Sequence, residues 1–272
     1  MQTEFPKGLR TFRLIPYEVQ DPVTNMAIDE ALLELHIRGK CPPTLRFYGW
    51  EPAAVSFGYS QKVSERVSDR LKELGLGMVR RPTGGRAVLH QGELTYSYVG
   101  PVGSKSVQQD YKEICRAFII GLEKLGVEVE LGRADSGYRS HEDCFEATTL
   151  ADLHHNGSKL VGSAQLRRKD SLLQHGSVIL DQKQDAMAYA LGLGSYAKTK
   201  ENQEHSESQT ALASKRHACL KDLVEVDRTS LEEAIGFGFS KVFDCTFSVY
   251  DLTFEEWQVV DSLKSDPEKY RV

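Results

Sequence analysis

Residues 80–90 read RRPTGGRAVLH, a Gly-Gly pair flanked by arginines between two short apolar runs. This pattern predicts a strand, a glycine turn and a second strand. Glycines let a backbone approach a ligand closely, and guanidinium groups are fixed donors for a phosphate or carboxylate. The same string is typical of a tight hairpin with solvated arginines. The stretch by itself therefore leaves a binding loop and a purely structural turn both open.

Hydrophobic periodicity predicts helices and strands on both sides of this stretch. Asp21-Pro22 is a typical helix start, and Gly39, Gly75 and Gly126 are typical helix ends. Helices are expected at 22–38, 63–74, 107–125, 230–239 and from 253 onward. Strands are expected at 11–17, 45–48, 53–57, 78–80, 127–131, 150–154, 159–165, 177–180 and 246–250, with 45–48 and 53–57 paired as a hairpin.

Hairpin signals are frequent, and the regular strand–helix–strand alternation of a doubly wound fold is missing. The predicted fold class is therefore α/β in the α+β sense: a mixed, largely antiparallel sheet with flanking helices, in a single domain over residues 1–272. The sequence has no G-x-G-x-x-G after a first strand and no G-x-x-x-x-G-K-[ST], which weakens nucleotide-fold interpretations. The polar stretch 195–217 is expected to be an exposed loop.

Composition argues against several classes of function. The formal net charge is -5 and basic residues form no tract, which argues against nucleic acid as a partner. No run approaches the roughly 18 to 20 apolar residues of a membrane span, and residues 1–10 lack an apolar signal core, so a cytoplasmic protein is expected. The five cysteines form no C-x-x-C pair and are expected to be free thiols. No metal site is expected, and solvated positions are predicted for His141, His154 and His155.

A lysine enters a strand of small and apolar residues at Lys159–Gln165, KLVGSAQ. The preceding Asn156-Gly157 is the dipeptide that most favours a tight turn with positive φ at both positions. A lysine that faces a pocket can hold a carbonyl oxygen or lower the pKa of a nearby thiol, and Gly162, Ser163 and Ala164 leave room for a ligand. A lysine that extends along a sheet edge into solvent is the structural alternative.

Cys144 follows a long polar loop, at the point where the chain is expected to return to the sheet. It lies fifteen positions before Lys159, and the turn at 156–157 could bring the two together in space. Cys115 on a helix and Cys245 in a strand are instead expected to be buried small apolar residues. His175, followed by Gly176 at a strand start, is expected either to line a pocket or to bond to the backbone as a structural histidine.

Four motifs, in this order, resemble the biotin/lipoate protein ligase superfamily: Leu45–Trp50 (LRFYGW), Arg80–His90, Lys159–Gln165 and Gln174–Gly176 (QHG). The resemblance implies a mixed-sheet catalytic core related to class II aminoacyl-tRNA synthetases over about residues 25–225, with a C-terminal extension over about 226–272. It also implies a substrate-binding set that comprises Arg81, Thr83, Gly84, Gly85, Arg86, Ala87, His90, Gly162, Ser163, Ala164, His175 and Gly176.

Residues 144–147 (CFEA) fall where the octanoyltransferases of the LipM type in this superfamily carry their nucleophile. The resemblance implies an acyl-thioester on Cys144, a thiolate and oxyanion stabilised by Lys159, and no ATP or other cofactor. The implied donor is octanoyl-acyl carrier protein. The implied acceptor is the lipoyl domain of a glycine cleavage H protein or of a 2-oxoacid dehydrogenase E2 subunit, and the enzyme is expected to be a monomer.

Three alternatives stay open. The chain could be an ATP-dependent lipoate or biotin ligase in which Cys144 is incidental. It could be an amidotransferase that moves octanoyl from one lipoyl domain to another, or a family member that only binds lipoyl domains or carrier protein. Dependence on ATP and the choice of acyl donor discriminate between these alternatives.

Overall fold

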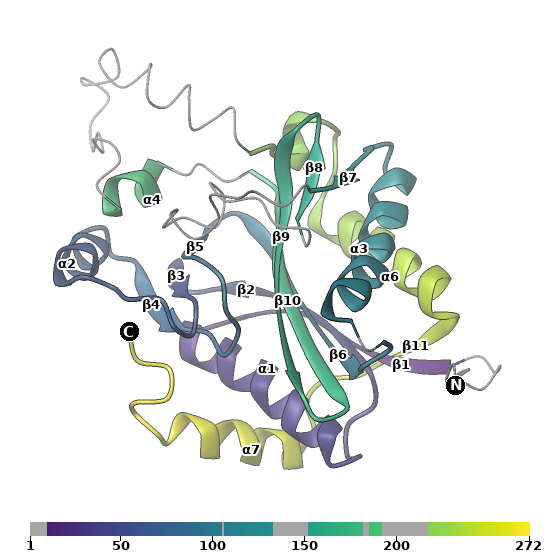
Figure 1. Cartoon of the computed structure of the whole chain (residues 1–272), viewed down its shortest axis with the longest axis horizontal. Helices are drawn as coiled ribbons and strands as arrows, with labels where there is room; N and C mark the ends of the chain where they lie inside the picture. Colours follow the sequence, from purple (N-terminus) through teal and green to yellow (C-terminus); the bar gives the residue numbers. More distant parts are fainter. Residues whose placement is uncertain (1–9, 105, 133–151, 182–184, 192–216) are drawn as a thin grey trace.

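The computed structural model describes residues 10–104, 106–132, 152–181, 185–191 and 217–272. Eight strands form one large sheet in the order β11-β1-β2-β6-β10-β9-β8-β7 (Figure 1). Pairing is parallel from β11 through β1 to β2 and antiparallel from β2 to β7, so the predicted mixed, largely antiparallel sheet is confirmed. The strands are β1 (Arg10–Gln20), β2 (Thr44–Trp50), β6 (Glu93–Pro101), β7 (Glu130–Leu131), β8 (Leu153–His155), β9 (Ser158–Arg168), β10 (Ser171–Ile179) and β11 (Cys245–Val249).

A smaller sheet holds the Gly-Gly stretch, and its topology corrects two predictions. Its order is β4-β3-β5, with β3 (Ala54–Phe57) between β4 (Gly77–Arg80) and β5 (Val88–His90). The predicted hairpin of β2 with β3 is wrong, because both edges of β2 are occupied by β1 and β6. The hairpin reading of 80–90 is also wrong. Because β3 lies between β4 and β5, residues 81–87 cross over the end of β3 from one of its edges to the other.

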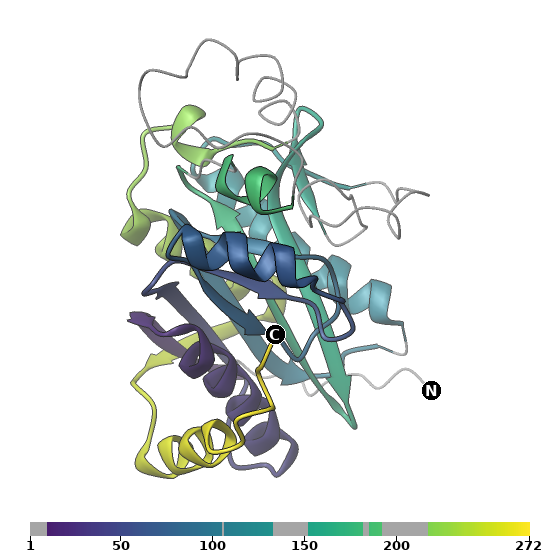
Figure 2. The ribbon, with the colours of Figure 1, turned by 90° about the vertical axis from the view of Figure 1, so that its left-hand side faces the viewer.

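Helices cover both faces of the large sheet. On one face lie α3 (Val107–Lys124) and α6 (Arg228–Phe243), and on the other lies α1 (Pro22–Ile37), with α7 (Phe254–Lys264) packed outside it (Figures 1 and 2). The small sheet stands beside α1, and α2 (Glu65–Glu73) packs against β4 and against α4 (Asp185–Ala190). The fold therefore has two distinct sides, which we call the α3 face and the α1 face of the large sheet.

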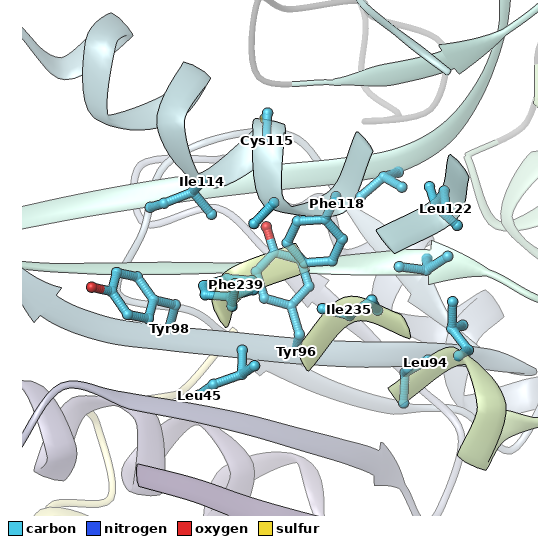
Figure 3. Packing of buried hydrophobic residues seen from close by; sticks show 14 of the residues in the cluster. Leu45, Leu94, Tyr96, Tyr98, Ile114, Cys115, Phe118, Leu122, Ile235 and Phe239 are labelled. Carbon is cyan, nitrogen blue, oxygen red and sulfur yellow. The ribbon is translucent and has the colours of Figure 1, made fainter. Parts of the chain in front are cut away.

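The α3 face holds the main aromatic core. The Tyr96 ring on β6 lies 4.3 Å from the Phe118 ring on α3, and Phe118 meets Phe239 of α6 edge-on at 5.8 Å (Figure 3). Cys115 and Cys245 are buried in this cluster, as predicted. Burial of such large rings is a major source of folding free energy.

Local turn chemistry agrees with the sequence in several places. Gly39, Gly75 and Gly126 have positive φ after their helices, and Asn156 and Gly157 form the predicted turn with φ of 49° and 79°. Strand β10 is longer than predicted, because helices cover both of its faces and the alternation of polar and apolar residues is lost. His154 is 6% exposed on β8, so its predicted solvation is wrong.

Candidate active site

Arg81 organises the Gly-Gly segment from inside. Its side chain is 4% exposed, and its guanidinium donates to the carbonyl oxygens of Gly84 at 2.9 Å, Arg86 at 2.6 Å and Ser56 at 2.8 Å. These N–H groups are thus engaged by protein carbonyls, and the contact of Arg81 with a ligand stays a prediction. They bind the loop backbone, which would otherwise carry unsatisfied carbonyls.

Close backbone packing sets the shape of the turn. Gly85 has a φ of 99°, a conformation that favours glycine. A Cβ on the neighbouring Gly58 would lie 2.1 Å from the Gly85 carbonyl oxygen, so both glycines are required for this approach. Gly84 is exposed, Arg86 is half-buried and Ala87 is buried. Gly84 is thus the part of the turn that is open to a ligand.

Thr83 ties the turn to the large sheet. Its hydroxyl lies 2.7 Å from Nε2 of His175 on β10, and Nδ1 of His175 lies 3.0 Å from Oδ2 of Asp29 on α1. Thr83 is 1% exposed, His175 5% and Asp29 0%. Of the two roles predicted for His175, the structure therefore shows bonds to side chains within the site rather than to the backbone.

Asp29 is a buried carboxylate with several partners. Arg46 on β2 donates to its Oδ1 at 3.0 Å, and the hydroxyl of Tyr48 donates to its Oδ2 at 2.9 Å. Arg46 also donates to Oδ1 of Asn25 at 2.6 Å, one helical turn before Asp29. Burial raises the pKa of Asp29, but the hydrogen bond from His175 and the charge of Arg46 outweigh it and lower the pKa overall. Asp29 is therefore an anion in the folded protein.

His90 is the last residue of β5 and lies beside the same turn. Its Nε2 is 2.8 Å from the Ser56 hydroxyl, its Nδ1 is 2.9 Å from Oε1 of Glu93, and its ring stacks on Trp50 with centroids 3.9 Å apart. Burial lowers the pKa of His90, and hydrogen bonding to Glu93 opposes the shift only in part. His90 is a neutral side chain in the wall of the site.

The small residues of β9 and β10 divide between the two faces. Ala164 lies opposite His175 and Gly162 opposite Ser177, which places both on the α1 face with Thr83. Ser163 instead bonds to the hydroxyl of Tyr96 at 2.7 Å, and a Cβ on Gly176 would meet the Tyr96 ring. The predicted set is therefore split, because the side chains of Ser163 and Gly176 belong to the α3 face.

Lys159 is buried in an ion pair and does not extend into solvent. Its Nζ lies 3.0 Å from Oδ1 of Asp152, and both side chains are 1% exposed. A register irregularity between β8 and β9 occurs at this point, and the backbone of Lys159 also forms a bridge with His217. The sheet-edge alternative for Lys159 is wrong. Cys144 lies outside the described residues, as do 195–216 of the predicted loop.

Sequence reasoning missed the residues that hold the site together, namely Asp29, Asn25, Ser56, Glu93 and Asp152. A signal was present for two of them. Asn25 and Asp29 are four positions apart in the predicted helix 22–38, a spacing that puts both on one helical face.

No group of three or more His, Cys, Asp or Glu side chains in the described ranges is arranged to hold a metal ion. Within the same ranges, no helix has the length and apolar character needed to cross a bilayer.

A cavity of about 200 Å³ lies on the α3 side, between the start of α3 and the end of α6, away from Thr83.

Comparison with known proteins identifies the family of the chain. The lipoyl protein ligase A/B catalytic domain matches residues 21–235. The octanoyltransferase LipM of Kyrpidia tusciae is 36% identical over 271 residues, which cover 94% of this chain and 95% of that protein. The LipM of Moorella thermoacetica is 44% identical over 195 residues, covering 69% and 71% of the two chains.

Solved structures show the same fold at lower identity. Lipoate-protein ligase A bound with ATP has a TM-score of 0.75 at 23% identity, and the match covers 94% of this chain and 95% of that one. A bipartite lipoate protein ligase from Thermoplasma acidophilum has a TM-score of 0.73 at 22% identity, with 94% and 93% covered. The predicted family is confirmed: the chain belongs to the lipoyl protein ligase A/B catalytic domain family and, within it, to the LipM octanoyltransferases, which are acyltransferases.

Proposed function

We propose that this octanoyltransferase carries the octanoyl group as a thioester on Cys144, with octanoyl-acyl carrier protein as donor and a lipoyl-domain lysine as acceptor. The observation that carries the proposal is the similarity to LipM proteins over nearly the whole chain, joined to a buried ammonium at Lys159. The acceptor domain would belong to a glycine cleavage H protein or a 2-oxoacid dehydrogenase E2 subunit.

The proposed first step is thioester exchange. The Cys144 thiolate attacks the acyl carbonyl, a tetrahedral oxyanion forms, and the carrier's thiolate leaves. A positive charge near the sulfur lowers a thiol pKa and stabilises the developing oxyanion. Asp152 supports this role for Lys159, because its carboxylate lies 3.0 Å from the buried amine, and ion pairing of this kind holds an ammonium group in place. One thioester replaces another, so the step needs no ATP.

The proposed second step is aminolysis. The neutral amine of the acceptor lysine attacks the Cys144 thioester, the C–S bond breaks, and an amide forms as the proton lost by the nitrogen passes to the departing cysteine sulfur. An amide is more stable than a thioester, which drives the transfer forward. We propose that the ligand contacts come from the α1 face: the Gly84-Gly85 turn, Arg86, Gly162, Ala164 and the ring of His175.

The test is incubation of the purified protein with octanoyl-acyl carrier protein in the absence of ATP, followed by intact mass measurement. We expect one added octanoyl group that hydroxylamine removes. Cys144→Ser should lose this labile adduct, whereas Cys219→Ser, a half-buried cysteine with no proposed role, should keep it. An unchanged adduct in Cys144→Ser would overturn the mechanism.

The same assay separates the alternatives. A ligase would form its product only with ATP and free acid, and an amidotransferase would accept octanoylated H protein but not acyl carrier protein. A protein that only binds its partners would gain no mass with any donor.

A further inference from the structure

We infer that Asp29 and Glu93 are positioning residues for the acyl-transfer site: each carboxylate orients one histidine, and each histidine holds one part of the segment 81–87 that carries the Gly-Gly turn. The inference rests on the proposed role of this turn in holding the acyl group. It assigns a shared task to two carboxylates that come from different elements and touch no reacting atom.

The first chain of bonds runs from Asp29 to Thr83. Asp29 is ionised and has no proton to donate, so Nδ1 of His175 must be the donor in the 3.0 Å bond. Arg46 forms a second buried contact with the same carboxylate, at Oδ1. The Nδ1–H tautomer leaves Nε2 as an acceptor for the Thr83 hydroxyl at 2.7 Å.

The second chain runs from Glu93 to Arg81. His90 donates from Nδ1 to Oε1 of Glu93 at 2.9 Å, and its Nε2 accepts the hydroxyl of Ser56 at 2.8 Å. The same hydroxyl oxygen accepts from Nη1 of Arg81 at 3.1 Å. Every donor in this series meets an acceptor only when His90 is neutral and carries its proton on Nδ1.

The two chains converge on one short segment. Arg81 and Thr83 also bond through their backbones, Arg81 N–H to the Phe57 carbonyl at 2.9 Å and the Tyr59 N–H to the Thr83 carbonyl at 2.8 Å. The segment is therefore held by both side-chain and main-chain hydrogen bonds at Arg81 and at Thr83, before Gly84. A turn held in this way presents its amides in one orientation before the ligand arrives, which is the requirement for pre-organised stabilisation of an oxyanion.

The direct test is the tautomeric state of the two histidines, read from ¹⁵N chemical shifts of the uniformly histidine-labelled protein. His90→Gln and His175→Gln assign the signals among the eight histidines. We expect both rings to be neutral Nδ1–H tautomers at pH 7.5. An Nε2–H tautomer at either ring would overturn the inference, and this measurement requires neither acyl transfer nor a carboxylate variant.

Carboxylate variants then test whether Asp29 and Glu93 set the tautomers of the two histidines. Asp29→Asn should shift the His175 signals towards a mixture of tautomers and leave His90 unchanged, and Glu93→Gln should do the reverse. Glu30→Gln is the matched control, because Glu30 is the next residue of α1 and is also a buried, ion-paired carboxylate, but it contacts neither histidine. If Glu30→Gln moves the His175 signals as far as Asp29→Asn does, the assignment to Asp29 is refuted.

Variants of Thr83 test the positioning role through the rate of acylation. Thr83→Val keeps the shape but removes the hydroxyl, and we expect acylation to slow about 10- to 100-fold, the loss typical of a small misplacement. Thr83→Ser restores the hydroxyl and should restore the rate. Equal loss in both variants, or no loss in Thr83→Val, would refute the positioning role. A failure of Cys144 to become acylated would instead refute the proposed function and leave the tautomer result intact.

Discussion

At the scale of single residues, the buried pair of Lys159 and Asp152 is the contact with the largest consequence for the proposed chemistry. Both side chains are 1% exposed, and each charge would be costly to bury without the other. The pair explains how an ammonium can persist inside the protein. It also predicts that the stability and the chemistry of Lys159 can be separated.

Lys159→Met should abolish acyl transfer and destabilise the fold by about 3 to 5 kcal/mol, because the buried carboxylate of Asp152 loses the ammonium that lies 3.0 Å from it. The double variant Lys159→Met, Asp152→Leu should recover most of this stability, since an apolar pair of similar volume replaces the ion pair. It should remain inactive. Urea unfolding and the octanoyl mass assay check the two parts. A stable double variant that still forms the adduct would show that Lys159 has no chemical role.

At the scale of elements, α3 and α6 approach each other through glycines. A Cβ on Gly238 would lie 1.9 Å from the carbonyl oxygen of Ala117, and a Cβ on Gly121 would lie 2.6 Å from that of Ala234. These contacts place Phe118 of α3 against both Phe239 of α6 and Tyr96 in the main core (Figure 3). The two helices cannot keep this distance if either glycine gains a side chain.

Gly238→Ala should therefore destabilise the protein by about 1 to 3 kcal/mol, the usual cost of overpacking. Gly236→Ala on the same helix is the control, because no atom lies within 4 Å of its added Cβ. Alanine is the better helix former, so this control should be neutral or more stable by up to about 1 kcal/mol. Urea unfolding measures both. Equal effects at the two positions would contradict the close packing of α3 and α6.

At the scale of the whole molecule, the end of the chain is bound to its beginning. Arg13 of β1 pairs with Glu256 of α7 at 2.5 Å, Tyr270 donates to Glu30 of α1 at 3.0 Å, and β11 pairs with β1. Residues 226–272 thus share hydrogen bonds and a buried ion pair with the core. These links support the proposal that the chain forms a single domain.

Buried ionisable side chains make the stability of the protein depend on pH in two ranges. The folded-state pKa of His90 lies below its ordinary value of 6.5, so only the unfolded chain takes up this proton as the pH falls below about 6.5, and stability decreases there. The pKa values of Asp29 and Glu256 are also lowered, but for carboxylates the stabilisation is full above their ordinary values of 3.8 and 4.5 and is lost below them.

Urea unfolding from pH 8 to pH 3 should therefore show two separate declines in the free energy of unfolding. His90→Gln should reduce the first slope by up to about 1.4 kcal/mol per pH unit, the limit for one proton. The second decline should remain. A free energy of unfolding that stays constant between pH 7.5 and 5.5 would contradict the burial of a neutral His90.

The sequence by itself determined most of the order of the elements, the class of fold and the family. Local chemistry explains this success. The positive φ at Asn156, Gly157 and Gly39 follows from residue type, and helix periodicity follows from which side of a helix is buried. The motif around Gly84-Gly85 is local too, so its presence could be read without coordinates.

Only the tertiary structure decided which strands are neighbours, which face each site residue occupies and which charges pair. The crossover of β4 past β3, the split of Ser163 and Gly176 from Ala164, and the contacts of Asp29 with His175 all join segments far apart in the chain. Their common physical reason is burial. A polar group withdrawn from water must find a partner wherever the fold supplies one, and no local pattern names that partner.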